Sequence, residues 1–219
     1  MNARDRAPRI LQRLIETYHA QRDGAFLHFT NPLELLVATI LSAQCTDARV
    51  NTVTPTLFAR YPTARDYATA DLQEIQHIIH PTGFYRQKAR ALKENGRILC
   101  ERFHGEVPCR MDDLLTLRGV SHKTANIVLA KGCGISAGIA VDTHVARISR
   151  RLDLTRHSRP LAIARALERL FPSQEYLAVN EYFILHGRAT CRARAPRCAQ
   201  CCIAQWCPRR GVSPQSRKS

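Results

Sequence analysis

The sequence predicts an all-α protein, and three observations carry this prediction. Apolar residues recur at helical spacing through most of the chain, and Pro, Gly or capping residues bound each candidate helix. No run of alternating polar and apolar residues is long enough for a convincing strand. The chain has 219 residues, 45% of them hydrophobic, which is enough for one large domain or two closely packed ones.

The helices can be assigned in order along the chain. An amphipathic face runs from Ile10 to Tyr18. The clearest helix start has Asn31 as the cap, Pro32 in the first turn and Glu34 three residues after the cap. After this helix, which buries residues up to Leu41, further helices are predicted near residues 47–60, 70–79, 85–103, 111–116, 122–131, 143–151, 160–171 and 175–188.

The charge is strongly positive and unevenly distributed. Lys and Arg number 33 and Asp and Glu 18, which gives a formal charge of +15 and indicates a polyanionic partner. No carboxylate follows Glu181, so the C-terminal part of the chain is a basic region. The last residues, 211–219, are predicted to be a disordered tail.

The sequence gives no sign of a membrane segment. The longest apolar stretch, residues 35–43, is too short to cross a bilayer, and residues 1–10 lack the apolar core of a signal peptide. We therefore expect a cytoplasmic protein that is monomeric and has no membrane partner.

Nine cysteines in such a protein favour metal binding over a disulfide framework. Four of them follow the last helix with the spacing C-x6-C-x2-C-x5-C: Cys191, Cys198, Cys201 and Cys207. Soft thiolates in one compact loop favour a [4Fe–4S] cluster, and zinc is the alternative. Cys202 is an additional cysteine in this loop. The remaining four, Cys45, Cys100, Cys109 and Cys133, are expected to be buried small residues.

Several segments, taken together, resemble endonuclease III, the iron–sulfur branch of the helix-hairpin-helix DNA glycosylase and AP-lyase superfamily. They are residues 41–47, 83–85, 117–125, 139–145 and 184–191, with the three later cysteines. The resemblance implies two interlocked helical domains, residues 25–135 with the hairpin and residues 1–24 plus 136–210 with the cluster. It implies removal of oxidised or ring-reduced pyrimidines from double-stranded DNA, followed by strand cleavage at the abasic site.

The resemblance also implies the catalytic residues. Residues 117–125 are similar to the family's hairpin motif L-P-G-V-G-R-K-T-A, in which the Lys is the nucleophile; here it is Lys123. An amine that attacks the sugar C1′ can form a Schiff base, and burial together with the helix N-terminus would favour its free form. Asp142, in the family's V-D-T-H segment, would deprotonate this amine or stabilise the charge at C1′. As a helix cap it would also have a structural role.

The hairpin departs from the family pattern at three positions. Arg118 replaces Pro, Ser121 replaces the second Gly, and His122 replaces a permanent cation. If residue 121 requires a positive φ, Ser is strained there, and we expect weaker or altered DNA binding. Gly119, Ser121 and His122 remain candidate DNA-binding residues because backbone N–H groups of such a turn bind phosphates.

Other candidate DNA contacts come from three further segments. Gln44 and Phe84 match the positions where the family inserts side chains into the opened duplex, although Phe84 could instead belong to the core. Arg192, Arg194 and Arg197 lie between the first two cluster cysteines and could contact phosphates.

Four alternatives remain open. The chain could be a DNA-binding iron–sulfur protein with weak or altered glycosylase activity, mainly an AP lyase or an enzyme of different base specificity. It could be a monofunctional glycosylase of the same fold, although the presence of Lys123 argues against this. It could be a DNA-binding module without activity, against which Lys123 and Asp142 both argue. The fourth alternative is a small iron–sulfur electron carrier, but such a protein would not need a hairpin of this kind.

Overall fold

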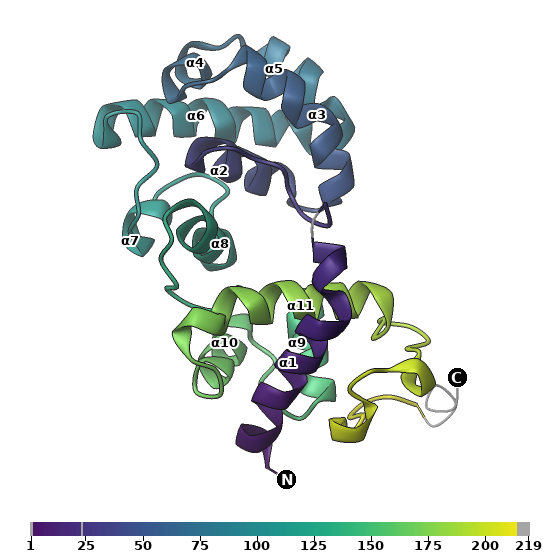
Figure 1. Ribbon diagram of the computed structural model, residues 1–219. Coiled ribbons are helices and arrows are strands. Elements are labelled where there is room, and N and C mark those ends of the chain that lie inside the picture. Colours follow the sequence, from purple (N-terminus) through teal and green to yellow (C-terminus); the bar gives the residue numbers. More distant parts are fainter. Residues whose placement is uncertain (1, 23, 214–219) are drawn as a thin grey trace. The chain divides into compact units, whose positions relative to one another are not determined.

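The computed structural model describes residues 2–22 and 24–213, and within these ranges it contains helices and loops but no strand (Figure 1). This confirms the all-α class. The α-helices are α1 (Ala3–Arg22), α2 (Pro32–Leu41), α3 (Asp47–Arg60), α4 (Ala64–Thr69), α5 (Leu72–Ile79), α6 (Tyr85–Phe103), α7 (Met111–Leu114), α8 (His122–Gly132), α9 (Thr143–Arg151), α10 (Pro160–Glu168) and α11 (Tyr176–Ala189). Short 3-10 turns are η1 (His80–Thr82), η2 (Ser173–Glu175), η3 (Cys198–Gln200) and η4 (Ala204–Trp206).

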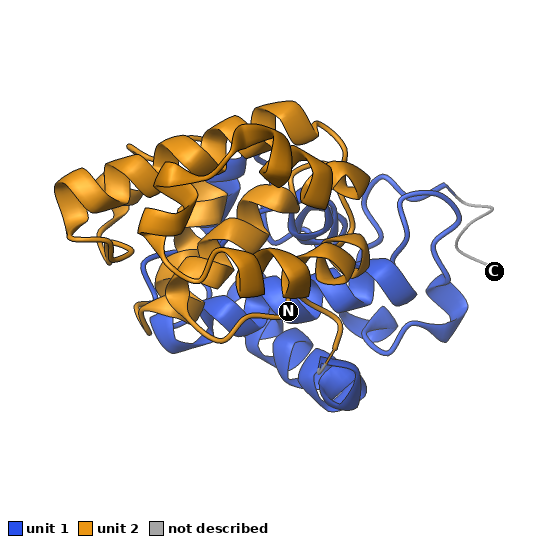
Figure 2. Cartoon of the chain, turned by 90° about the horizontal axis from the view of Figure 1, so that it is seen from above, with its two compact units in different colours: residues 1–23, 136–219 blue, residues 24–135 orange. Residues whose placement is uncertain are grey.

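The chain divides into two compact units (Figure 2). Unit 1 combines residues 1–23 with residues 136–219, and unit 2 is the continuous segment 24–135. Unit 1 holds most of the Lys and Arg residues but fewer than half of the Asp and Glu residues. Among the described helices of either unit, none has the length and apolarity required to cross a membrane.

Unit 2 is built around α2 and α6. α6 packs against α2, α4 and α5, and α8 packs against α2 and α7. The predicted start of α2 is confirmed, because Asn31 Oδ1 accepts a hydrogen bond from Glu34 N at 2.9 Å. From this start α2 buries a continuous apolar segment, residues 35–41, in the core of the unit.

Unit 1 is built around α11, which packs against α1 and α9. The close approach of α9 requires glycine at Gly187, because a Cβ there would lie 2.5 Å from His144 Nδ1. α10 ends at Glu168, three residues before the predicted end. Pro172 explains the early end, since the residue before a proline is disfavoured in the helical region.

The predicted disordered tail lies largely outside the described residues, which end at Ser213. Of its first residues, Val212 is buried and lies in a cavity lined by the four cluster cysteines. The described chain therefore stays packed against the rest of unit 1 as far as Val212, one residue beyond the predicted start of the tail.

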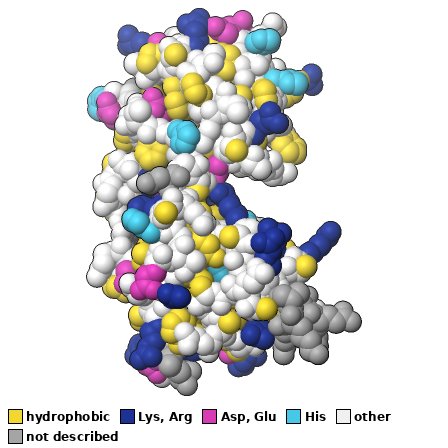
Figure 3. Space-filling view, turned by 45° about the vertical axis from the view of Figure 1, so that its right-hand side comes forward, with side chains coloured by type: hydrophobic (Ala, Val, Ile, Leu, Met, Phe, Trp, Pro, Cys, Tyr) yellow, Lys and Arg dark blue, Asp and Glu magenta, His cyan; other side chains and the backbone are white. Residues whose placement is uncertain are grey.

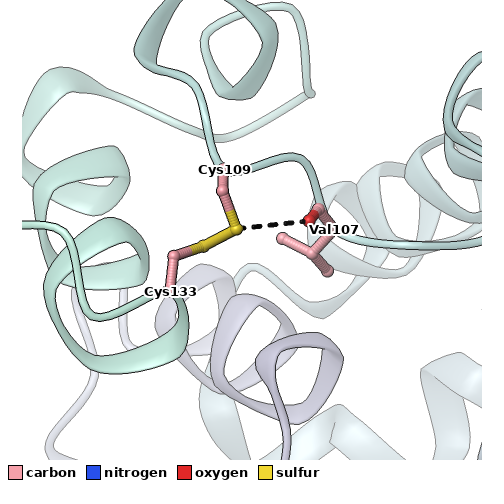
Figure 4. Close-up of a disulfide and its surroundings, with 3 residues drawn as sticks. All are labelled: Val107, Cys109 and Cys133. Atoms are coloured by element: carbon pink, nitrogen blue, oxygen red, sulfur yellow. Dashed lines mark hydrogen bonds between the residues drawn. A yellow bond between two sulfur atoms is a disulfide. The ribbon is translucent and has the colours of Figure 1, made fainter.

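The expectation for Cys109 and Cys133 was wrong. The two residues form a disulfide, with the Cα atoms 5.8 Å apart (Figure 4). Cys109 is exposed and lies just before α7, and Cys133 is the C-cap of α8. Because α7 packs against α8, the chain returns on itself and the two ends of this segment meet, although they lie 24 positions apart in the sequence. Spacing in the sequence does not show this return of the chain.

This disulfide closes the segment that contains Lys123, and its removal is expected to destabilise the protein. The double variant Cys109→Ser and Cys133→Ser should lose about 2–4 kcal/mol of unfolding free energy, because the unfolded chain regains the entropy of an open loop. Denaturant unfolding of the oxidised protein measures this loss. Cys100→Ser, which replaces a free cysteine of the same unit, is the matched control and should unfold at the natural midpoint. Equal midpoints for the control and the double variant would rule out a bridge in solution.

Candidate functional site

The hairpin between α7 and α8 is shaped by glycine at one position only. Gly119 has φ +77°, in the left-handed region where other residues are strained, and a Cβ there would be 3.6 Å from the Ile40 side chain of α2. Ser121 has φ −99° and is the N-cap of α8, with its Oγ accepting from Thr124 N at 3.3 Å. The hypothesis that Ser121 is strained is therefore wrong, because this position needs a capping side chain and not a positive φ.

Lys123 lies in the first turn of α8, directly after this cap and after His122. Both side chains are exposed, so unit 2 by itself does not bury Lys123. The backbone N–H groups of this turn are available to a phosphate.

The two candidate wedges share an unusual backbone conformation. Gln44, in the loop after α2, has φ +54°, and Phe84, before α6, has φ +48°. Left-handed backbone costs a residue with a Cβ roughly 1–2 kcal/mol. Both side chains are exposed, and Phe84 is 57% exposed, so the alternative that it belongs to the core is wrong. Two strained residues that expose side chains of insertable size fit a role in contacting a partner.

Asp142 is the N-cap of α9 and is half-buried. Its Oδ1 accepts from Val145 N at 2.8 Å, which confirms the capping role and leaves Oδ2 for another partner. The chain before it is held by the buried Asn180, whose side-chain amide donates to Ala140 O. The carboxylate is therefore fixed from both sides, on the helix that it caps and on the preceding loop.

His144, in the first turn of α9, is a structural residue in unit 1. Its Nδ1 lies 3.1 Å from the guanidinium of Arg147, and burial, with Arg147 and Arg188 adding to it, lowers the pKa of the imidazole. A neutral ring suits this position, where the His144 side chain packs against Gly187 of α11. This agrees with the interpretation that His144 is not the acid or base.

The four cysteines of the C-terminal loop line one cavity in unit 1. Cys191, Cys198, Cys201 and Cys207 line this cavity together with the buried His186 and Ile203. Burial raises the pKa of the Cys201 thiol to about 12 and also raises that of Cys207, because a thiolate is poorly solvated there. Cys202 does not line this cavity.

Thiols buried in this way fit a group that carries its own positive charge. An iron–sulfur centre or zinc ion stabilises thiolates that burial alone disfavours. Among the described residues, no three His, Cys, Asp or Glu side chains already stand as a closed metal-binding group. The residues supply the donor set in one cavity, and a bound centre would have to draw the sulfur atoms together.

Two arginines of α9 hold the start of the cysteine loop. Arg147 donates to Gly187 O and to Cys191 O, and Arg151 donates to Arg192 O at 2.6 Å and to Ala193 O at 3.0 Å. Arg151 also lies 3.4 Å from Cys191 Sγ. The helix that Asp142 caps is therefore bound directly to the loop that carries the cysteines. The sequence analysis did not identify these two arginines.

Arg192, Arg194 and Arg197 are exposed between the first two cysteines of the loop. Figure 3 shows Lys and Arg side chains spread widely over the face in view. Gln44, Phe84, Gly119, Ser121, His122 and Lys123 all lie in unit 2, whereas Asp142, the arginines and the cysteines lie in unit 1.

The chain is similar to several known proteins. Residues 37–173 match the family described as HhH-GPD superfamily base excision DNA repair protein. A protein of Synechocystis sp. named endonuclease III is 53% identical over 182 residues, which is 83% of each chain. Endonuclease III of Bacillus subtilis is 43% identical over 179 residues, 81% of each chain. A solved structure of a non-covalent endonuclease III–DNA complex superimposes with a TM-score of 0.87 at 37% identity, covering 95% of this chain and 97% of the other.

Proposed function

Because this chain belongs to the endonuclease III family of helix-hairpin-helix base-excision DNA repair proteins, we propose that it excises oxidised or ring-reduced pyrimidines from duplex DNA and then cleaves the strand at the abasic site. Membership makes it a DNA glycosylase and AP lyase that acts on DNA. The observation that carries the residue-level proposal is the position of Lys123, in the first turn of α8 directly after the hairpin.

In the proposed reaction the Nζ of Lys123 attacks C1′ of the damaged nucleotide. The bond from C1′ to the base breaks, the base leaves with the bonding electron pair, and a Schiff base forms between Nζ and C1′ after the sugar ring opens. The positive Schiff base acidifies C2′, and loss of a proton there expels the 3′ phosphate. A strand break and an enzyme-bound sugar result, and water then releases the sugar.

Asp142 is proposed to accept the proton that the Lys123 ammonium must lose, or to stabilise positive charge on the sugar. Since its Oδ1 is engaged as the cap of α9, Oδ2 is the atom that would do so. The exposed Gln44 and Phe84 are proposed to enter the stack that the damaged nucleotide leaves. Gly119, Ser121 and His122 would contact phosphates beside it.

The cysteine cavity is proposed to hold a [4Fe–4S] cluster on Cys191, Cys198, Cys201 and Cys207, and the shared cavity and the thiol chemistry support this. The cluster would fix the fold of the loop, so that Arg192, Arg194 and Arg197 face DNA phosphates. A protein that binds DNA in this way would be found on the nucleoid.

Borohydride trapping tests the proposed chemistry. On duplexes with a thymine glycol or an abasic site, reduction of the Schiff base should give a covalent protein–DNA band, and Lys123→Ala should abolish it. Lys131→Ala, at the other end of the same helix, is the control and should keep the band. A band on the abasic duplex alone would reduce the function to AP lyase or to another base specificity. Absence of a band for the natural protein on both duplexes, with DNA bound, would refute the proposal.

A further inference from the structure

α6 carries a buried lysine that the proposed reaction does not use. Lys88 is only 5% exposed, and its Nζ donates to two backbone carbonyls, Leu41 O at 2.7 Å and Thr82 O at 2.9 Å. Among the described residues no carboxylate forms an ion pair with it. Burial lowers the pKa of this amine, so its position carries an electrostatic cost that the two carbonyls offset.

The two carbonyls belong to the segments that expose the candidate wedges. Leu41 is the last residue of α2, and the chain continues from it to Gln44. Thr82 is the last residue of η1, and the chain continues through Gly83 to Phe84. One ammonium group therefore ties together the starting points of both loops, which lie far apart in the sequence.

Both wedge residues need such an anchor. Gln44 and Phe84 have left-handed backbone, and their exposed side chains gain little from contacts within the protein. A strained conformation persists only where the surroundings determine it. A carbonyl that is fixed just before each loop limits the directions in which the loop can leave the helix, and Lys88 fixes both.

The same helix fastens the hairpin by a similar device. Asn95 lies two turns after Lys88 and is buried, with Oδ1 accepting from Arg118 N at 2.7 Å and Nδ2 donating to Arg118 O at 2.9 Å. Arg118 directly precedes Gly119 of the hairpin turn. α6 thus holds both wedge loops and the hairpin through two buried polar side chains on one face.

We propose that Lys88 is a positioning residue that sets the Gln44 loop against the Phe84 loop, so that both side chains can enter the duplex at the same lesion. This inference rests on the proposed function for the role of the wedges. It predicts a defect that depends on the opposite strand, because single-stranded DNA has no partner base to displace. A residue that only stabilised the fold would affect both kinds of DNA equally.

The test compares Lys88→Met with Lys93→Met. Methionine keeps the apolar stem but donates no hydrogen bond. Lys93 is the matched control, because it lies on the same helix and donates to a single carbonyl away from the wedge loops, Ala70 O at 2.8 Å.

Strand cleavage is measured at an abasic site in duplex and in single-stranded DNA. Lys88→Met should lower the duplex rate roughly 10- to 100-fold, the scale expected for a small misplacement of contacting groups, and leave the single-strand rate within about twofold. Lys93→Met should change neither.

A second measurement does not depend on the chemistry. A 2-aminopurine placed opposite the abasic site brightens when it loses its stacking, and Lys88→Met should lose most of this increase at saturating protein. If Lys88→Met does not fold, Lys88→Gln, which keeps an amide donor, is tested in the same way. Its cleavage rate should also fall on duplex DNA and not on single-stranded DNA, by a smaller factor.

The outcomes separate this inference from the proposed function. Equal losses on duplex and single-stranded DNA, or an unchanged 2-aminopurine signal, would overturn the positioning role. If the natural protein cleaves neither DNA, the proposed function fails, and the fluorescence comparison still decides the role of Lys88.

Discussion

An Asp142→Asn variant is expected to fold with nearly natural stability and to lose about 100- to 10,000-fold in turnover, the range typical of a removed general acid or base. The structure makes this variant informative, because Asp142 is also the N-cap of α9 through Oδ1. Asn is about as good a cap as Asp, so the exchange keeps the hydrogen bond to Val145 N and removes only the charge and basicity of the carboxylate.

Asp142→Ala is the companion variant that separates the two roles. It removes the cap as well as the carboxylate and should lower the unfolding free energy by about 1 kcal/mol in addition to the loss of turnover. Thermal unfolding and single-turnover cleavage of a thymine glycol duplex measure the two effects. If Asp142→Asn kept the natural turnover while Asp142→Ala abolished it, Asp142 would be a structural cap, and another group would have to accept the proton.

Much of the fold could be read from local signals. The helix from 85 to 103 and the helix from 143 to 151 have the bounds that the structure shows, because their apolar spacing is regular. α4 was missed because it spans only residues 64–69, too few for a periodic pattern. Its start is instead marked by a capping box between Thr63 and Asp66, which a search for caps would have found.

The positions that sequence reasoning missed are polar groups whose partners lie far away in the chain. Lys88 and Asn95 occupy the same face of α6 as the buried Leu92 and Leu99. A polar residue within the apolar face of a helix is therefore a sequence signal of a buried hydrogen bond. Their partners, at residues 41, 82 and 118, cannot be read from spacing. The Cys109–Cys133 bridge was missed for the same reason.

At the hairpin, the resemblance to the family motif led to a wrong inference about the backbone. The family pattern has Gly at residue 121, and a positive φ was inferred from that residue type. The backbone there is extended and serves as a helix cap, a role in which Ser ranks above Gly. The hairpin departure at Ser121 therefore carries no strain, and of the two hairpin positions at which the family pattern has Gly, only residue 119 depends on the conformational freedom of glycine.

A Cys201→Ser variant is expected to lose the proposed cluster and, with it, most of the affinity for duplex DNA. Cys201 lines the cavity with the other three thiols, and burial raises the pKa of its thiol to about 12. A serine hydroxyl is a hard oxygen donor that replaces a soft thiolate poorly. Without the bound centre the loop would lose its fixed form, and Arg192, Arg194 and Arg197 would no longer be held toward phosphates.

Cys202→Ser is the matched control, since Cys202 is the next residue in the chain and does not line the cavity. Iron, sulfide and zinc analysis, visible absorption and the salt dependence of duplex binding are measured on both variants. Iron and sulfide should be present in the natural protein and in Cys202→Ser and absent from Cys201→Ser, and the loss of phosphate contacts should flatten the salt dependence.

Zinc without sulfide in the natural protein would replace the cluster by a zinc site on the same four cysteines. Loss of iron in Cys202→Ser but not in Cys201→Ser would show that the ligand set was assigned to the wrong member of this adjacent pair.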